Sequence, residues 1–366
     1  MTIDTPVRSS LKPYSIHPVQ QYIIDAADKW PSKIAVIDGD RRFSFGELNA
    51  HSDRLSGALA DMGIKKGDRV GLLAPNCAEF EIAFVGVLKA GAIVTTINSG
   101  YREREIAHQL NNSRASVLIV HDSLTEMADA ARPLLDEPPE VIVIHPDGTD
   151  ASSFWGRIAA VPPEAPKVAI DPMNDLAVLP YSSGTTGLSK GVMLTHHNLT
   201  SNVEQFLKRP GEFAEPRPDD VVMVHLPLFH IYGMNVLMNP CIAIGNAQVM
   251  MGRFDIDEFL GLLDQHSVTA LYTVPPVLVG LAKYPGVKDH DLSALRFMVI
   301  GAAPLSTELQ TRVQSVTGVP VLQAYGMTET SPYTNADFAE SDRARPGSVG
   351  PAGADTEQKV VDLEEG

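Results

Sequence analysis

The residues from Tyr181 to Gly191, YSSGTTGLSKG, combine glycines and hydroxyl side chains with a single cation. Glycines allow backbone N–H groups to approach an anion closely, and serine and threonine hydroxyls donate further hydrogen bonds. The ammonium of Lys190 supplies a point charge suited to phosphate. We therefore predict a phosphate-binding loop that includes Ser182, Ser183, Gly184, Thr185, Thr186, Gly187 and Lys190.

This loop differs from the P-loop of many nucleotide-binding proteins, in which Gly-Lys-Ser/Thr opens a helix. Here Ser189 precedes Lys190, Gly191 follows it, and the next residues, GVMLTH, favour a strand. The expected arrangement is therefore strand, loop, strand. A surface loop rich in glycine and serine is the alternative, but the density and order of these residues favour phosphate binding.

A histidine and a tyrosine follow a buried strand that the sequence predicts at residues 221–227. The segment LPLFHIYG (226–233) places His230 and Tyr232 at the carboxyl end of that strand, where α/β sheets usually place their sites. The functional interpretation makes both side chains part of a ligand pocket at this edge of the sheet. A histidine and a tyrosine packed in the core are the alternative.

Two further turns offer room and charge for a nucleotide. The small residues of GAAPL (301–305), between a predicted strand and a helix, leave space for a flat ring, although a tight turn would need the same residues. In QAYGMTET (323–330), Glu329 offers a carboxylate next to the hydroxyl of Thr328. Mg²⁺ prefers one or two carboxylates together with phosphate oxygens, so Glu329 is the expected metal ligand. A solvated loop glutamate is the alternative.

Together these segments resemble the adenylate-forming superfamily of acyl-CoA synthetases, luciferases and peptide-synthetase adenylation domains. YSSGTTGLSKGVMLTHHNL is similar to the signature loop of that superfamily, and GVMLTH looks most like the 4-coumarate and fatty acid CoA ligases. LPLFHIYG and YGMTE also match motifs of the superfamily. The resemblance covers the whole chain, which corresponds to the N-terminal domain and stops ahead of the C-terminal domain.

The resemblance implies a role for each motif. It implies that the loop holds the phosphates of ATP and that His230 lies beside the acyl carboxylate, in a substrate pocket lined by Tyr232 and Val236. It also implies nucleotide contacts, with Tyr325 stacked on adenine and Thr328 at the α-phosphate, from Gly301, Ala302, Ala303, Gln323, Ala324, Tyr325, Gly326, Met327 and Thr328. The implied catalytic residues are Lys190, His230, Thr328 and Glu329.

The implied activity is the ATP-dependent activation of a carboxylic acid to acyl-AMP, followed by transfer to CoA, with ATP, Mg²⁺ and CoA required. No protein nucleophile is needed, because positioning and charge neutralisation carry the chemistry. The alternatives are delivery of the acyl group to a carrier protein or to oxygen, and a non-catalytic nucleotide-binding remnant. The ribose-binding aspartate and the C-terminal-domain lysine of the family would lie beyond Gly366, so we expect impaired turnover by this chain.

Alternating strands and helices must position these motifs. Continuous apolar strands such as RVGLLA (69–74) and SVLIVH (116–121), separated by helical segments, predict parallel sheets covered on both faces. We predict an α/β fold of two doubly wound, mostly parallel subdomains packed together, followed by the start of a small β-barrel. The predicted units are residues 1–172, 173–328 and 329–366. A helix is expected over 124–135, a linker over 145–172 and a strand over 358–363.

The composition limits the partners of the protein. The chain has 366 residues, of which 45 are acidic and 29 are Lys or Arg, so its net charge is −16. This acidity disfavours binding to nucleic acid or to anionic membranes. Two cysteines, no signal peptide and no membrane-spanning apolar run predict a cytoplasmic protein. We expect small-molecule partners, namely a carboxylic acid, ATP and CoA, and leave a homodimer open.

Overall fold

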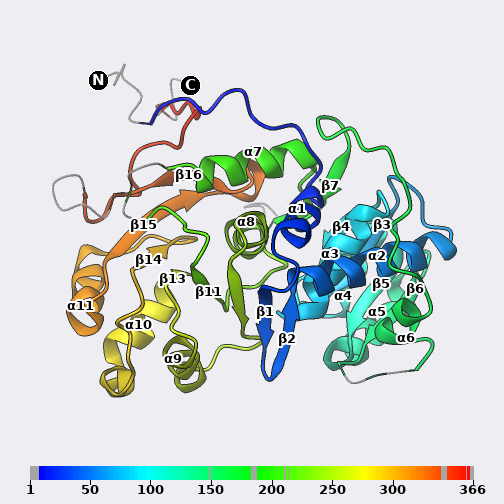
Figure 1. The fold of residues 1–366 in the computed structure, drawn as a ribbon, viewed down its shortest axis with the longest axis horizontal. Helices are drawn as coiled ribbons and strands as arrows, with labels where there is room; N and C mark the ends of the chain where they lie inside the picture. The colour runs from blue at the N-terminus through cyan, green and yellow to red at the C-terminus, as the bar shows by residue number, and fades with distance from the viewer. Residues whose placement is uncertain are drawn as a thin grey trace.

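The chain forms two large sheets with helices on their faces (Figure 1). The structure, a computed structural model, describes residues 8–146, 148, 150–182, 188–209, 212, 214–338, 344–359, 361 and 362. Both sheets are mostly parallel. Among the described strands, antiparallel pairs occur only at the edges of each sheet. The predicted α/β class, with two mostly parallel sheets, is confirmed.

The first sheet has six strands. In spatial order they are β10 (Leu194–Thr195), β7 (Leu176–Val178), β4 (Ile93–Thr96), β3 (Arg69–Leu73), β5 (Ala115–His121) and β6 (Glu140–Ile144). The helices of this half are α2 (Phe45–Asp61), α3 (Ala78–Lys89), α4 (Glu103–Ser113), α5 (Thr125–Ala131) and α6 (Phe154–Ala159). Beside this sheet, β8 (Tyr181–Ser182) and β9 (Lys190–Gly191) form a two-stranded antiparallel ribbon that flanks the predicted loop. The strand expected over GVMLTH is interrupted at residues 192 and 193 and ends where α7 begins.

The second sheet has eight strands. In spatial order they are β16 (Tyr333–Ala336), β15 (Val321–Gly326), β14 (Phe297–Ile300), β13 (Ala270–Thr273), β11 (Val221–Val224), β12 (Ala247–Met250), β1 (Ile34–Asp38) and β2 (Arg41–Ser44). Its helices are α1 (Gln21–Lys29), α7 (His196–Leu207), α8 (Asn239–Ile244), α9 (Ile256–Gln265), α10 (Pro275–Lys283) and α11 (Thr307–Thr317). Figure 1 shows α7 and α8 on one face of this sheet and α9 to α11 on the other.

Helix α3 joins the two sheets. All twelve of its residues are buried, as expected of a helix that is apolar on nearly every side. Its two glutamates face the eight-stranded sheet: Glu79 pairs with Arg41 of β2, and Glu81 accepts a hydrogen bond from Gln248 of β12 over 3.2 Å. The two halves therefore share one packed interior.

The sheets do not divide the chain at residue 172. Strands β1 and β2 come early in the sequence but lie in the eight-stranded sheet, where Val36 pairs with Gln248. Strands β7 and β10 come after residue 172 but lie in the six-stranded sheet. The division into units 1–172, 173–328 and 329–366 therefore stays a prediction, and strands cross its first boundary in both directions.

Several local expectations change in the structure. The helix expected over 124–135 is broken into η1 (Asp122–Leu124), α5 and η2 (Arg132–Leu134), because Pro133 cannot continue an α-helix. The expected linker contains α6, whose N-cap Ser153 accepts a hydrogen bond from the backbone N–H of Gly156. Helix α7, which begins directly after the GVML segment, was not expected from the sequence.

The C-terminal part differs most from expectation. Strand β16 joins the eight-stranded sheet antiparallel to β15, and Asn335 forms an isolated bridge with Ala352. The strand expected over 358–363 is absent at residues 358, 359, 361 and 362, and its other two residues lie outside the described chain. The described residues form no closed barrel. No helix within them is long and apolar enough to cross a membrane.

Candidate active site

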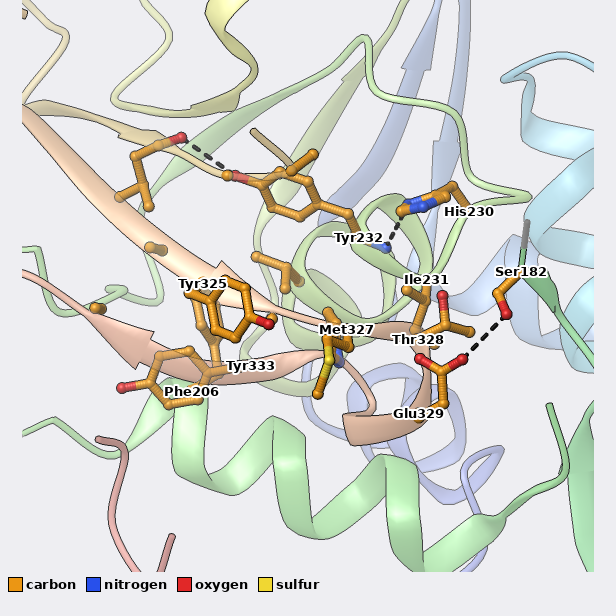
Figure 2. Close-up of a pocket in the computed structure, with 18 of the residues that line it drawn as sticks. Ser182, Phe206, His230, Ile231, Tyr232, Tyr325, Met327, Thr328, Glu329 and Tyr333 are labelled. Carbon is orange, nitrogen blue, oxygen red and sulfur yellow. Dashed lines mark hydrogen bonds between the residues drawn. The ribbon is translucent and has the colours of Figure 1, made fainter. Parts of the chain in front are cut away.

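A cavity of about 390 Å³ lies beyond the carboxyl ends of β11, β14 and β15 (Figure 2). Its lining residues are Ser182, Phe206, Arg209, His230, Ile231, Tyr232, Val236, Val299, Gly301, Ala302, Ala324, Tyr325, Gly326, Met327, Thr328, Glu329, Pro332, Tyr333 and Ala336. The three segments predicted at residues 226–233, 301–305 and 323–330 therefore meet in one place, because parallel strands deliver their carboxyl ends to the same edge of a sheet.

His230 lies at one end of this cavity with its tautomer defined. The backbone N–H of Tyr232 donates to Nδ1 of His230 over 3.2 Å, so the proton of a neutral imidazole resides on Nε2. The ring is accessible from the cavity but closely surrounded by protein, and this burial lowers its pKa. His230 is therefore a neutral N–H donor near pH 7, suited to orient a carboxylate or carbonyl oxygen.

Tyr232 crosses the cavity and packs against the turn at residue 301. Its hydroxyl lies 3.2 Å from the carbonyl oxygen of Val299 and 3.4 Å from that of Thr273, and burial raises the pKa of the phenol. A Cβ at Gly301 would lie 3.0 Å from Cε1 of Tyr232, a tighter contact than most side chains make, so the glycine lets the ring pack closely on this turn. Ala302 has a φ of 67°, an uncommon conformation for a residue with a Cβ, of a kind that concentrates at functional sites.

Val236 lines the same cavity from an unusual helix. It lies in η3 (Gly233–Met238), a π-helix that leads into α8, and its side chain is buried. Single turns of π-helix occur frequently at functional sites. A Cβ at Gly233, the first residue of this helix, would lie 2.3 Å from the carbonyl oxygen of Pro227, so the chain turns tightly between Pro227 and Gly233, the segment that carries His230.

Glu329 lies beside the first residue of the predicted phosphate loop. It belongs to η5 (Thr328–Thr330), and its Oε1 accepts a hydrogen bond from the Ser182 hydroxyl over 3.0 Å (Figure 2). Lys190 is exposed and pairs with Ser182 across the β8–β9 ribbon, although it does not line the cavity. Ser183, Gly184, Thr185, Thr186 and Gly187 lie outside the described residues.

The remaining predicted nucleotide residues divide into two groups. Ala324, Tyr325, Gly326, Met327 and Thr328 line the cavity, and Tyr325 and Met327 are each a little under half exposed. Gln323 does not line it: its Oε1 accepts a hydrogen bond from the backbone N–H of Leu305 over 2.9 Å, which ties β15 to the 301–305 turn. Ala303 is exposed and also outside the lining.

A second cavity, of about 270 Å³, meets the first at His230. Both cavities are lined by Ser182, His230, Ile231 and Thr328. The second extends between the two sheets, along residues that include Thr96, Asn98 and Tyr101 of the six-stranded half. The histidine and threonine can therefore be reached from two separate directions.

Sequence reasoning missed the far end of the first cavity. Phe206 lies in α7, Arg209 comes directly after that helix, and Tyr333 belongs to β16. Neither α7 nor β16 was predicted from the sequence. Figure 2 shows Phe206 and Tyr333 on the side of the cavity away from Ser182, His230 and Glu329. The helical spacing of Leu199, Val203 and Phe206 after the N-cap of α7 was the available signal.

Comparison with known proteins gives consistent matches. The sequence profile of the family described as AMP-binding enzyme matches residues 23–366. The chain is 37% identical over 355 residues to 4-coumarate–CoA ligase 5 of Oryza sativa subsp. japonica, an alignment that covers 95% of this chain. The chain spans 65% of the length of that relative.

Solved structures with the same fold include two CoA ligases. Anthranilate CoA ligase AuaEII, in complex with anthranoyl-AMP, superposes with a TM-score of 0.86 at 26% identity, covering 95% of this chain and 66% of that one. A long-chain-fatty-acid-CoA ligase, FadD1 from Archaeoglobus fulgidus, gives a TM-score of 0.89 at 25% identity, covering 100% of this chain and 74% of that one.

Proposed function

This chain belongs to the family of AMP-binding enzymes, and from that premise we propose that it activates a carboxylic acid with ATP to an acyl-AMP, whose acyl group then passes to CoA. The observation that carries the proposal is the meeting of polar residues from three separate segments where two cavities join: Ser182, His230 and Thr328, with Glu329 beside them in the first cavity. One cavity would hold the acyl-AMP, and the other would admit the acceptor.

In the first step, a carboxylate oxygen of the acid attacks the α-phosphorus of ATP, the bond from that phosphorus to the bridging oxygen breaks, and pyrophosphate leaves. His230, neutral with its proton on Nε2, would donate to the acid carboxylate and orient it. The hydroxyl of Thr328 would donate to the α-phosphate, and Lys190 would neutralise charge on the leaving phosphates. The side chains position the reactants and neutralise charge, and none of them becomes covalently modified.

Magnesium fits the donors at this end of the cavity. Glu329 offers an exposed carboxylate, and Ser182 offers a hydroxyl oxygen 3.0 Å from it. Oxygen ligands of this kind, with phosphate oxygens completing the set, are those that Mg²⁺ prefers. When bound, the ion would supply neutralisation of the charge that develops on pyrophosphate.

In the second step, the thiol sulfur of CoA attacks the acyl carbonyl carbon, the bond from that carbon to the AMP oxygen breaks, AMP leaves, and the thiol proton passes to solvent water. The cavity along Thr96, Asn98 and Tyr101 also reaches His230 and Thr328, and Tyr232 does not line it. A thiol arriving through it would meet the acyl carbon without displacing the nucleotide. CoA rather than a carrier protein is the acceptor that we propose.

The walls of the first cavity suit an aromatic or alkyl acid. Val236, Val299, Phe206, Tyr232 and Tyr333 supply mostly apolar or aromatic surface away from the polar end. Apolar walls with a few convergent polar groups are typical of small-molecule sites, and they favour a substrate with one carboxylate and an apolar body.

Binding of a non-hydrolysable acyl-AMP analogue tests this proposal directly. An aryl acyl-sulfamoyl adenosine should bind the 366-residue chain in calorimetry, and acid-dependent exchange of labelled pyrophosphate into ATP should accompany it. The variant Thr311→Ala, on the exposed face of α11, should bind the analogue as tightly as the parent does. Absence of both binding and exchange across a panel of aryl and alkyl acids would refute the proposed activity.

A further inference from the structure

The loop that carries His230 is held by side chains from the other sheet. Residues 225–230 follow β11 of the eight-stranded sheet and lie in no helix or strand. Asn76, in the turn between β3 and α3 of the six-stranded half, is 7% exposed and spans this loop. Its Nδ2 lies within 3.0–3.2 Å of the carbonyl oxygens of Val224, Leu226 and Met251, and its Oδ1 accepts from the N–H of Leu228 over 2.9 Å.

Thr96 fixes the next stretch of the same loop. It ends β4 of the six-stranded sheet and is 2% exposed. Its hydroxyl donates to the carbonyl oxygen of Phe229 over 2.8 Å, directly before His230 in the chain. The neighbouring Thr95 is fully buried, and its hydroxyl instead donates to the carbonyl oxygen of Leu179 over 3.0 Å. Two consecutive threonines therefore hold two different segments.

These contacts set where the His230 ring lies. Without a strand ladder, the backbone of residues 225–229 takes its register from Asn76 and Thr96, because buried backbone groups need partners. His230 and Tyr232 continue directly from that segment, and the Tyr232 N–H to His230 Nδ1 hydrogen bond defines the tautomer. A displaced Phe229 carbonyl would rotate the following peptide and weaken that bond.

We propose that Asn76 and Thr96 are positioning residues for His230, through which the six-stranded half sets the orientation and tautomer of an imidazole carried by the other half. The consequence for catalysis rests on the proposed function, whereas the effect on the ring does not. The two can therefore be tested separately.

Nitrogen NMR of the imidazole rings tests the effect on the ring. Protein labelled with ¹⁵N-histidine has eleven histidines, and the His230 signals are identified by their loss in His230→Ala. Thr96→Val preserves shape and removes the hydroxyl, so the Nδ1 and Nε2 shifts of His230 should move toward each other as the tautomers mix. Thr95→Val, of matched size and burial, should leave them in place. Unchanged His230 shifts in Thr96→Val would overturn the proposal.

Asn76 is tested in the same spectrum. Asn76→Ser removes the contacts of Nδ2 with the three carbonyl oxygens named above. It should move the His230 nitrogen shifts in the same direction as Thr96→Val. The control is Asn246→Ser: Asn246 is also buried, but its Nδ2 donates to the Arg217 carbonyl at the other end of β12. If Asn76→Ser does not fold, Thr96→Val alone decides the question.

A double-mutant cycle tests the consequence for catalysis. Thr96→Val should lower kcat of acid-dependent pyrophosphate exchange about tenfold and leave KM for ATP unchanged, since small misplacements of an orienting group carry losses of this scale. In a His230→Ala background the same change should cause no further loss, because the two residues act as one unit. Equal losses in both backgrounds would refute positioning through His230. If the parent neither binds the acyl-AMP analogue nor shows exchange, the proposed function fails, and the NMR comparison still decides this inference.

Discussion

The hydroxyl of Ser182 donates a hydrogen bond to the carboxylate of Glu329 over 3.0 Å, although 147 residues separate them in the chain. This bond places the start of the predicted phosphate loop against the predicted metal ligand. A phosphate held by the loop would therefore lie next to a carboxylate, which needs a cation between them to avoid repulsion. The geometry makes Glu329 the first residue to test.

Glu329→Gln keeps the shape of the side chain, and its Oε1 can still accept from Ser182. The variant should need more Mg²⁺ to reach half-maximal pyrophosphate exchange, because the charged oxygen that Mg²⁺ prefers is gone. The measurement is a magnesium titration, with Glu308→Gln on exposed α11 as the control. Superimposable titrations for Glu329→Gln and the parent would identify Glu329 as an ordinary loop residue.

Lys190→Ala should weaken ATP binding more than acid binding. Lys190 lies opposite Ser182 in the β8–β9 ribbon and is exposed to solvent. Loss of a charge-assisted phosphate contact should reduce the binding free energy of ATP by about 2–3 kcal/mol. Calorimetry with ATP measures this, with the exposed Lys288→Ala as control. Equal ATP affinity in Lys190→Ala and parent would contradict the phosphate assignment.

Gly301→Ala tests the contact between the 301–305 turn and Tyr232. The new methyl carbon would lie 3.0 Å from Cε1 and 3.3 Å from the hydroxyl oxygen of Tyr232, so the ring must move. We expect KM for the acid to rise about tenfold, a typical consequence of a small shift in a positioning group. Gly261→Ala, where a Cβ meets nothing within 4 Å, should leave KM unchanged. A KM in Gly301→Ala equal to that of the parent would show that Tyr232 does not border the acid.

Phe206→Ala should admit longer acids. The ring is 4% exposed and lies 6.1 Å from that of Tyr333, centroid to centroid, at the far end of the cavity. Its removal should lower KM for an acid one ring or several methylenes longer, at a cost to stability of about 3–5 kcal/mol. Phe259→Ala removes a buried ring that does not line the cavity and should cost similar stability without changing acid preference. An unchanged preference in Phe206→Ala would place the acid elsewhere.

Glu81 predicts a pH dependence of stability. Burial raises its pKa to about 8 in the folded protein, against an ordinary value of 4.5. The folded state therefore retains a proton that the unfolded state releases, so this contribution is fully present below pH 4.5 and is lost as the pH rises to about 8. Glu81→Gln removes this titration, so the unfolding free energy of the variant should fall less between pH 5 and pH 8 than that of the parent. The difference should be several kcal/mol, on the order of 1.4 kcal/mol per pKa unit.

Urea unfolding at pH 5 and pH 8 measures that slope. The exposed Glu308→Gln is the control and should retain the decrease seen in the parent. If Glu81→Gln and the parent lose the same free energy across this range, Glu81 does not hold its proton in the folded state. A buried carboxyl between the sheets would then need a charged partner.

Local patterns in the sequence predicted much of the fold. Helix α2 begins at a complete capping box formed by Ser44 and Glu47, a pattern contained in four consecutive residues of the sequence. Alternating apolar strands predicted the sheets, because each signal lies within a few consecutive residues. Helix α7 was missed because Thr195 ends β10 and caps the helix at once, so a strand signal runs into a helix start.

Long-range contacts explain what the sequence could not predict. Motif residues such as His230, Thr328 and Glu329 could be named because their segments resemble known motifs, and the structure brings them together. Asn76 and Thr96 carry no local signal, since their partners lie 152 and 133 residues away in the chain. Arg209 and Tyr333 enter the cavity through α7 and β16, whose places depend on neighbours elsewhere in the chain.

The pairing of β1 with β12 also has a consequence for biosynthesis. Val36 leaves the ribosome long before Gln248, the residue with which it pairs, so the early β1–β2 hairpin must wait while the six-stranded sheet is synthesised. During that time the edge of β1 that later pairs with β12 offers unpaired N–H and C=O groups, a template for wrong pairing. Translation speed and chaperone capture over this interval should therefore govern the yield of correctly folded protein more than the stability of the finished molecule does.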